Sequence, residues 1–417
     1  MINYPAFNES SVDWIGEIPK HWKTIRLKHV AGILPSNVDK HIYPDEIQVR
    51  LCNYTDVYYN DFITVDTVLT KGSCTEKEFS KFALKIGDVI ITKDSETPYD
   101  IGIPTFVKED LDNVVCGYHL TMIRSNECLG EFIFWFIKSD WTRRYFQLNS
   151  NGITRFGLGK SSIENLLIPI PSESEQTQIA NFLDRKTEQI DQLIRIKEQK
   201  IELLQEQRTA LINHAVTKGL DPNVEMKPSG VEWIGDIPKH WDLCLLKYTA
   251  RLIYGDSLIT ENREDGVVPV YGSNGIIDTH SSANTLSPAI IVGRKGSLGK
   301  VQYSDSSCFV IDTAFYIDRN TTNVNLRWLY YVLNTLKLER FQNSIVPGLN
   351  RENAESQHVP QITIAQQTQI ADFLDQKTKQ IDDLINAENK KIELLKEYRQ
   401  SLISEAVTGK IDVCNEA

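Results

Sequence analysis

A glycine-rich loop at residues 293–300 carries side chains suited to contact an anion or a base edge. It reads Gly-Arg-Lys-Gly-Ser-Leu-Gly-Lys, so Arg294 and Lys295 offer two neighbouring cations. The loop fails the Walker phosphate-binding pattern, because five residues rather than four separate its first and last glycines and valine follows its last lysine. As a turn between two strands, it is suited to contact phosphates or base edges of DNA. A plain basic turn is the alternative interpretation.

A second group of polar side chains precedes each of two long amphipathic segments. The strings Gly157-Leu158-Gly159-Lys160 and Gly348-Leu349-Asn350-Arg351 lie 191 residues apart, and the upstream loop 149–155 offers amide, hydroxyl and guanidinium groups. Such groups bond phosphates and base edges, although a loop-closing role is equally open for any single position. The candidate DNA-contacting residues are Lys93, Asn151, Thr154, Arg155, Lys160, Ser273, Asn274, Arg294, Lys295, Ser297, Asn350 and Arg351.

Motifs for catalysis or metal binding are missing from the sequence. It contains no HExxH, no GxSxG, no CxxC pair and no Asn/Asp-Pro-Pro-aromatic tetrapeptide. His21 and His240 both occur within Ile-Pro-Lys-His-Trp, where an anchoring role is more economical than a catalytic one. We therefore expect a binding protein that is not an enzyme, with no catalytic residues and no metal.

Composition predicts a globular chain of two or three domains. The 417 residues are 41% hydrophobic and 24% charged, with a net charge of −11 that is not concentrated in any one region. Charge alone therefore does not indicate DNA binding and permits it only through local patches or a basic partner. We find no signal peptide and no apolar run near the roughly 20 residues of a membrane span, so we expect a cytoplasmic protein.

The sequence repeats itself at its boundaries. Residues 12–28 and 231–247 share 11 of 17 positions, and residues 176–221 and 367–412 share 28 of 46 positions. The first match has an offset of 219 residues and the second an offset of 191, so the two copies differ by 28 residues between these blocks. A constant frame thus surrounds two interiors that differ in length and sequence.

Each later block predicts a long helix. Ser172-x-x-Glu175 and Thr363-x-x-Gln366 are capping boxes, and Gly219 and Gly409 lie where the helices should end. About 45 residues give a rod of roughly 65 Å. Apolar residues recur at threes, fours and sevens, close to coiled-coil spacing. Those expected to pair the helices are Ile179, Leu183, Ile190, Ile194, Ile201, Leu204, Ile370, Leu374, Ile381, Ile385, Ile392 and Leu395.

The simplest partner for each apolar stripe is its own copy. We predict an α+β fold of two strand-rich domains, each followed by a long helix, with the helices paired as an antiparallel coiled coil of pseudo-twofold symmetry. Packing of each helix on its own domain, or pairing between separate chains, are the alternatives. The predicted segments are domains at 1–171 and 219–362, helices at 172–218 and 363–409, and a tail at 410–417.

Within the two domains, short apolar runs and aromatic segments predict the secondary structure. Strands are expected at residues 88–92 and 120–123 of the first domain and at 289–292 and 308–310 of the second. The aromatic-rich segments 132–146 and 326–341 are expected to be helical, with their rings in the core rather than stacked on bases.

The doubled frame resembles the specificity subunit of Type I restriction-modification systems. It consists of Trp-Ile-Gly-x-Ile-Pro-x-x-Trp, a variable domain, Ile-Pro, and then Gln-Thr-Gln-Ile-Ala-x-Phe-Leu-Asp, and the resemblance spans about residues 12–412. It implies that each domain reads one half of an asymmetric bipartite DNA sequence. The segments 270–275 and 293–296 look like the family's commoner recognition domain, and the first domain lacks both strings.

The resemblance also implies partners and cofactors. Two modification subunits would dock on the paired helices and bring S-adenosylmethionine, and restriction subunits would bring ATP and Mg²⁺, while this chain binds no cofactor itself. The alternatives are a two-headed scaffold that binds proteins, which the charge would favour, and a fused nuclease-methyltransferase fragment that has lost its catalytic half.

Overall fold

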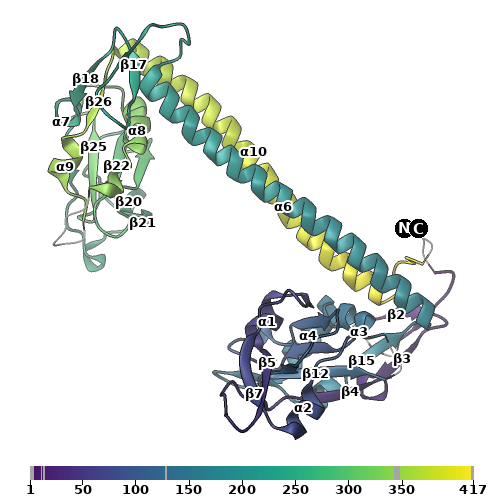
Figure 1. Ribbon diagram of the computed structural model, residues 1–417. Coiled ribbons are helices and arrows are strands. Elements are labelled where there is room, and N and C mark those ends of the chain that lie inside the picture. Colours follow the sequence, from purple (N-terminus) through teal and green to yellow (C-terminus); the bar gives the residue numbers. More distant parts are fainter. Residues whose placement is uncertain (1–3, 11, 13–14, 127–128, 342–347, 415–417) are drawn as a thin grey trace. The chain divides into compact units, whose positions relative to one another are not determined.

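The computed structural model describes residues 4–10, 12, 15–126, 129–341 and 348–414, which form two compact units (Figure 1). The first unit contains residues 1–197 and 390–417, and the second contains residues 198–389. Each unit therefore holds one strand-rich head together with a segment from each of two long helices. Among the described residues, no helix combines the length and apolar character needed to cross a membrane.

The first head has two sheets that share one hydrophobic core. The five-stranded sheet has the order β4 (Ala31–Pro35), β12 (Leu120–Ser125), β8 (Val89–Thr92), β10 (Pro104–Val107) and β6 (Phe62–Ile63). The three-stranded sheet has the order β11 (Val114–Cys116), β5 (Ile47–Cys52) and β7 (Thr70–Cys74), and the short helices are α1 (Tyr54–Tyr59) and α2 (Glu76–Phe82). The strands predicted at 88–92 and 120–123 are confirmed as β8 and β12, and both are central in the larger sheet, where apolar runs are expected.

The aromatic segment of the first head forms two helices rather than one. They are α3 (Gly130–Ile137) and α4 (Asp140–Asn149). Ser139 separates them because its hydroxyl accepts a hydrogen bond from the backbone N–H of Thr142 and so caps α4. The rings of Phe132, Trp135 and Phe146 are buried, which confirms their predicted place in the core.

The second head also contains two main sheets. The four-stranded sheet has the order β19 (Ile253–Tyr254), β25 (Ala314–Asp318), β22 (Ala289–Gly293) and β23 (Val301–Ser304), and the three-stranded sheet has the order β21 (Gly275–His280), β20 (Val268–Gly272) and β24 (Phe309–Val310). Its aromatic helix α8 (Leu326–Thr335) is shorter than predicted. It ends because Lys337 adopts a left-handed conformation with φ of 49°, and a 3-10 turn at Leu338–Arg340 follows.

The repeated frame closes each head by pairing its first and last strands. In the first head β3 (Lys23–Arg26) pairs antiparallel with β15 (Leu167–Ile170), and in the second β18 (Asp242–Leu245) pairs with β26 (His358–Gln361). Two hairpins precede these strands: β1 (Phe7–Glu9) with β2 (Glu17–Pro19), and β16 (Met226–Pro228) with β17 (Asp236–Pro238). The ends of each head therefore lie together, at the point where its long helix begins.

The long helices are α6 (Glu173–Lys218) and α10 (Ile364–Val407). Both predicted capping boxes form, since Glu175 N–H donates to Ser172 Oγ at 3.4 Å and Gln366 N–H donates to Thr363 Oγ1 at 3.3 Å. The predicted helix ends are also confirmed, because Gly219 and Gly409 follow with φ of 77° and 69°.

Within each unit, segments of α6 and α10 lie side by side and run in opposite directions (Figure 1). In the first unit Arg399 pairs with Asp191 at 3.0 Å, and in the second Lys200 pairs with Glu388 at 2.9 Å. Pairing of the two copies within one chain is thereby confirmed. Of the predicted pairing residues, eight are buried and Ile201, Leu204, Ile385 and Leu395 are half-buried.

Candidate nucleic-acid interface

The glycine-rich loop of the second head connects β22 to β23, as predicted, and is tightly held. The backbone N–H groups of Arg294 and Lys295 both donate to Thr313 O, at 2.9 and 3.0 Å. A Cβ on Gly293 would meet Ser297 O at 2.0 Å, so only glycine fits that position. The loop therefore presents its cations from a fixed backbone.

Candidate residues from three separate segments meet at this loop. Lys300 Nζ donates to both the backbone and the side-chain oxygens of Asn274, each at 2.8 Å. The N–H of Leu349 donates to Arg294 O at 2.9 Å, which ties the repeated segment before α10 to the loop. Ser273, Asn274, Arg294, Lys295, Ser297 and Arg351 thus belong to one surface of the second head.

Tyr254 organises this surface, and the sequence analysis missed it. The Cζ atoms of Arg294 and Arg351 lie 4.8 and 5.3 Å from the centroid of its ring. Tyr254 pairs with Phe315 across β19 and β25, and their ring centroids are 4.8 Å apart. Two guanidinium groups therefore share one aromatic ring, each at a cation–π distance. In the sequence, the string Tyr254-Gly255-Asp256 favours a turn and gives no other signal.

Several of the predicted residues near this surface have partners within the chain, among them Arg294, whose guanidinium donates to Asp312 O at 3.1 Å. Asn350 caps α9 (Arg351–Glu355), because its Oδ1 accepts a hydrogen bond from Asn353 N–H at 2.9 Å. Lys295 lies 3.5 Å from the carboxylate of Asp312, and both side chains are about half exposed. The structure therefore gives Asn350 a structural role, while Lys295 is accessible.

In the first head, a small sheet gathers the candidate residues. Its strands are β13 (Ser150–Asn151), β14 (Phe156–Leu158) and β9 (Asp94–Ser95). Leu158 N–H donates to Lys93 O at 2.7 Å, which places Lys93 beside the hairpin that exposes Asn151, Thr154 and Arg155. Lys160 begins α5 (Lys160–Glu164), where its side chain lies 3.4 Å from Glu164.

Beside this hairpin lies a pocket of about 460 Å³ that the sequence did not predict. Tyrosines of α1, carboxylates after β9 and Arg155 line it. Asp94 accepts from Lys93 and His119, each at 2.6 Å. Burial opposes ionisation of Asp94, but these two partners prevail and lower its pKa below the usual value, so Asp94 is a carboxylate at neutral pH.

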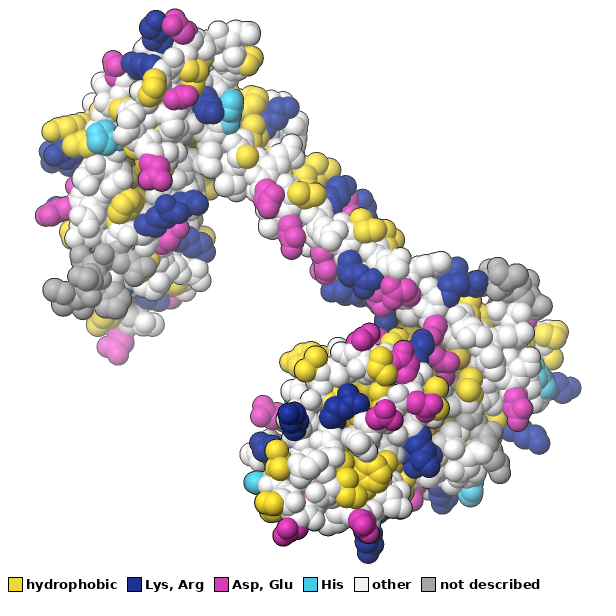
Figure 2. Space-filling view, in the orientation of Figure 1, with side chains coloured by type: hydrophobic (Ala, Val, Ile, Leu, Met, Phe, Trp, Pro, Cys, Tyr) yellow, Lys and Arg dark blue, Asp and Glu magenta, His cyan; other side chains and the backbone are white. Residues whose placement is uncertain are grey.

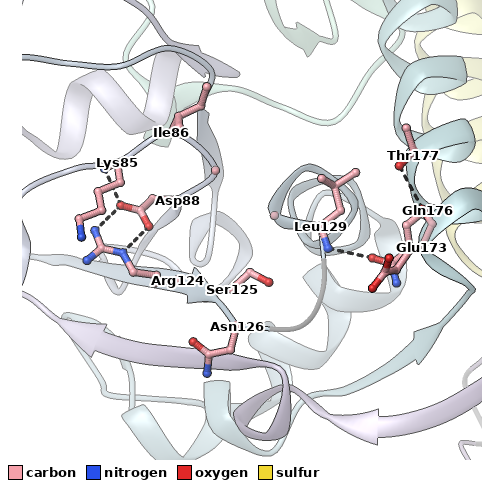
Figure 3. Close-up of a pocket in the computed structure, with 12 residues that line it drawn as sticks. Lys85, Ile86, Asp88, Arg124, Ser125, Asn126, Leu129, Glu173, Gln176 and Thr177 are labelled. Carbon is pink, nitrogen blue, oxygen red and sulfur yellow. Dashed lines mark hydrogen bonds and ion pairs between the residues drawn. The ribbon is translucent and has the colours of Figure 1, made fainter.

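A different pocket, of about 600 Å³, lies in the first unit where the head meets the start of α6 (Figure 3). Asp88 and Arg124 form a two-point ion pair at 2.7 and 2.6 Å on one wall. On the other wall Leu129 N–H donates to Gln176 Oε1 at 2.8 Å. None of the predicted DNA-contacting residues lines this pocket, and its strongest polar groups are paired with each other.

The frame histidines anchor the heads to the helices, as their sequence context indicated. His21 Nε2 and Trp22 Nε1 lie 2.8 and 3.1 Å from Glu175 Oε1 at the start of α6. Although burial opposes ionisation, hydrogen bonds from Ser172, His21 and Trp22 lower the pKa of Glu175 to about 2. In the second unit the corresponding contact joins His240 to Gln366 at 3.4 Å.

Charge is mixed over both units. Acidic and basic side chains alternate on the face seen in Figure 2, without a large field of one sign. Within the described ranges, no group of three or more His, Cys, Asp and Glu side chains is placed to hold a metal ion. The arrangement provides directed donors and acceptors at two exposed loop clusters, which is the chemistry of recognition.

Comparison with known proteins assigns the family. A model of the Type I restriction modification DNA specificity domain matches residues 19–206 and 241–394. Two curated specificity subunits of type I restriction enzymes from Methanocaldococcus jannaschii, MjaX and MjaVIII, are each 22% identical to this chain. The MjaX alignment covers 96% of both chains and the MjaVIII alignment covers 95% of both.

Solved structures share the fold. A chain from a structural study of complex assembly and conformational transition of the type I R-M system has a TM-score of 0.73 at 18% identity, covering 94% of this chain and 99% of that one. The HsdS subunit from Thermoanaerobacter tengcongensis has a TM-score of 0.55 at 18% identity, covering 94% of this chain and 98% of that one. With its doubled frame, two heads and paired helices, this chain belongs to the Type I restriction-modification DNA specificity family, whose members are the non-catalytic specificity subunits of these systems.

Proposed function

We propose that this chain reads an asymmetric bipartite DNA sequence, with one half-site for each head. The observation that carries the proposal is the assembly of candidate residues into an exposed cluster on each head, built from different side chains on the same frame. In the second head the cluster is rich in arginine and lysine, which favour guanine edges and phosphates. In the first head, tyrosines and carboxylates accompany the polar hairpin.

The paired helices would set the spacing between half-sites and bind two modification subunits. Leu193, Ile196 and Leu203 recur at intervals of three and seven, share one side of α6 and are 41%, 60% and 65% exposed. Leu384 and Leu394, at the matching positions of α10, are 48% and 53% exposed. On the face seen in Figure 2, hydrophobic side chains lie between charged ones along the helices. Apolar side chains repeated outside the helix seam fit a protein partner on each copy.

The partners would supply all of the chemistry in this proposal. The modification subunits would bring S-adenosylmethionine for DNA methylation, and restriction subunits would bring ATP and Mg²⁺. This chain's own part would be to bind double-stranded DNA and to orient those subunits on it.

The central test is a map of DNA methylation in cells that express this chain with its modification subunits. We expect one bipartite motif with two different halves. Replacing residues 29–156 with the corresponding segment of another family member should then change one half only. A change in both halves, or methylation without a bipartite motif, would contradict the proposal.

The spacing role has a separate test. Inserting seven residues after Leu204 adds two helical turns, or about 10 Å, and should lengthen the gap between the methylated half-sites without changing either half. A matched insertion in the exposed loop near Asp110 should leave the gap unchanged. An unaltered gap in the helix variant would remove the spacing role.

Docking can be tested at matched positions of the two helices. Leu193→Lys and Leu384→Lys should each weaken capture of modification subunits and reduce the bound ratio from two to one, because each substitution puts a charge into an apolar contact. Glu198→Lys, on the exposed surface of α6, serves as the charge control. If both leucine variants still bind two modification subunits, the subunits dock on a different surface.

A protein-binding scaffold remains the second candidate, because the net charge of −11 favours basic protein partners over DNA. Duplex binding by the complex separates the two functions. DNA recognition is supported if the affinity falls steeply with rising salt and if the complex prefers duplexes that carry the motif found by methylation mapping. The scaffold predicts neither result.

A further inference from the structure

The pocket of the first head combines aromatic faces with hydrogen-bond acceptors. Tyr54 and Tyr58 of α1 stack at 5.7 Å between ring centroids with an angle of 18°, and Tyr59 packs edge-on against Tyr58 at 4.9 Å. Tyr59 is 77% exposed, so the aromatic wall continues to the surface. We call the cavity that these rings line the tyrosine pocket.

The polar groups of the tyrosine pocket are held in place. Tyr58 OH donates to Asp100 Oδ2 at 2.6 Å, which raises the pKa of Tyr58 to about 12 and keeps its hydroxyl protonated. Asp94 is oriented by its bonds to Lys93 and His119. A carboxylate has lone pairs for several donors, so both Asp94 and Asp100 retain acceptor capacity.

The pocket opens beside the hairpin already assigned to the candidate interface. Arg155, just before β14, is one of its lining residues, and Phe156, the first residue of that strand, pairs with Ser95 of β9. A duplex that contacts Asn151, Thr154 or Arg155 would therefore bring base edges near the tyrosine pocket. The three carboxylates that line the pocket, Asp94, Glu96 and Asp100, disfavour a phosphate at this place, because they would repel its charge.

We propose that the tyrosine pocket reads the exocyclic amine of one adenine or cytosine in the first head's half-site, and that Asp94 and Asp100 accept hydrogen bonds from this amine at the base edge beside the tyrosines. Amines on base edges in the major groove donate hydrogen bonds that carboxylates accept, and aromatic rings make apolar contacts with such edges. The inference rests on the proposed function, and it assigns to the first head a base chemistry opposite to that of the second head, where guanidinium donors predominate.

The test uses the full chain with its modification subunits and duplexes that carry the methylation-mapped target. In separate duplexes, each adenine is replaced by purine and each cytosine by 2-pyrimidinone, which remove the amine, while 7-deaza bases remove the N7 acceptor of purines. One amine deletion in the first head's half-site should weaken binding about 10-fold or more. The 7-deaza base at the same base pair should have little effect.

Variants of the pocket connect that loss to named residues. Asp100→Ala and Asp100→Asn should abolish the extra loss caused by the amine deletion, and Tyr58→Phe should reduce it, while the second half-site is read as before. Asp66→Asn, an exposed carboxylate of the same head that does not line the pocket, is the control. Thermal unfolding of each variant separates lost recognition from lost folding.

Three outcomes are distinguishable. Failure to bind any bipartite duplex overturns the proposed function itself. Specific binding with no amine-sensitive position, or with the same sensitivity in the Asp100 variants, overturns only the pocket proposal. Spermidine binding that the Asp100 variants lose, measured by calorimetry without DNA while half-site reading is unchanged, would identify a polycation site and also overturn it.

Discussion

In the first unit the head meets α6 at Asp184, and in the second unit the head meets α10 at the matching position, Asp375. Asp184 accepts from Trp135 Nε1 at 3.1 Å and pairs with Lys108 at 2.5 Å. Asp375 accepts from Tyr331 OH at 2.5 Å and pairs with Arg327 at 2.7 Å. The same carboxylate of the repeat is thus satisfied by different head residues.

The two joints differ in charge balance. Next to Asp184 the first head places a second carboxyl, Glu131, whose nearest cation is Lys108 at 4.0 Å. Burial first, and then the charge of Asp184, raise the pKa of Glu131 to about 7, while Lys108 opposes this shift. The second joint has no such carboxyl pair among its described contacts, since Arg327 faces Asp375 directly.

This comparison shows which parts of a duplicated protein can diverge. The helix side of the joint is kept, with an aspartate in each copy, while the head side changes with the variable interior. Heads of different composition can therefore be joined to the same type of helix, provided that each head supplies a hydrogen-bond donor to the repeated aspartate.

The largest effect that we expect from this difference is a pH dependence confined to the first unit. A carboxyl whose pKa is about 7 in the folded state and about 4.5 when unfolded stabilises the fold below pH 4.5, and this contribution is lost as pH rises toward 7. The loss amounts to at most about 3 kcal/mol. Glu131→Gln should remove it, as measured by hydrogen exchange of α3 between pH 5 and 8. Arg327→Gln should instead destabilise α8 by up to about 1 kcal/mol at every pH in that range. A pH-independent first unit in the unaltered chain would contradict this prediction.

The next effect concerns the candidate DNA-contacting surfaces of the two heads. Arg294→Ala should weaken specific binding about 10-fold or more, and 7-deazaguanine in the second half-site should produce a similar loss in the unaltered chain but not in the variant. Lys227→Ala, at an exposed lysine of the same unit, is the control. If Arg294→Ala weakened recognition of both half-sites equally, the two heads would not differ in the base chemistry that they read.

Tyr254 should have a smaller effect on the same surface. Tyr254→Leu removes the ring against which both guanidinium groups lie and should weaken second-half-site reading about 2- to 5-fold, the size of an exposed cation–π contact. Tyr254→Phe keeps the ring and should restore binding. Loss of binding in the phenylalanine variant would indicate a role for the hydroxyl instead.

Removing the contacts of Glu175 should have a modest effect on the stability of the first unit. Glu175→Gln should lower the stability of the first unit by about 1–2 kcal/mol at neutral pH, because it removes the acceptor charge shared by His21 and Trp22. Since the pKa of Glu175 is lowered to about 2, this contribution is present above pH 4.5 and is lost as pH falls toward 2. Denaturant unfolding at pH 3 and pH 7 measures it, and equal differences at the two pH values would refute the ion-pair explanation.

The smallest effect that we expect is an increase in the stability of the second unit. Within the described residues Trp241 Nε1 is buried without a hydrogen-bond partner, whereas Trp22 Nε1 donates to Glu175. Gln366→Glu would give Trp241 and His240 the acceptor that the first unit has, and should stabilise the second unit by up to about 1 kcal/mol. A lower unfolding temperature for this variant would show that the added charge costs more than the new contacts contribute.

Periodicity predicted the long helices but not the full extent of their contacts. The capping residues, the helix ends and most of the paired apolar residues could be identified because they depend on neighbours within one turn. Leu193 and Leu384 follow the same spacing, yet they are 41% and 48% exposed. An apolar stripe gives the direction of a buried face, whereas its covered width depends on the partner helix.

The candidate sites show the same division. The glycine-rich loop and the polar hairpin were predicted from residue types, but Asn350 has a capping role that only its helix reveals. Tyr254 could not be identified because its neighbours Arg294 and Arg351 lie far along the chain. The tyrosine pocket depends on contacts between α1, β9 and the hairpin, which no local pattern encodes.

The sequence by itself determined the duplication, the two long helices and the family, because these rest on repeated residues and short-range periodicity. Only the tertiary structure decided how the helices pair, which side chains meet at each candidate interface, which apolar residues remain exposed and how each head satisfies the repeated aspartate. The reason is physical: hydrogen-bond donors, charges and rings act over a few ångströms in space, and the residues that supply them here are separated by tens of positions in the chain.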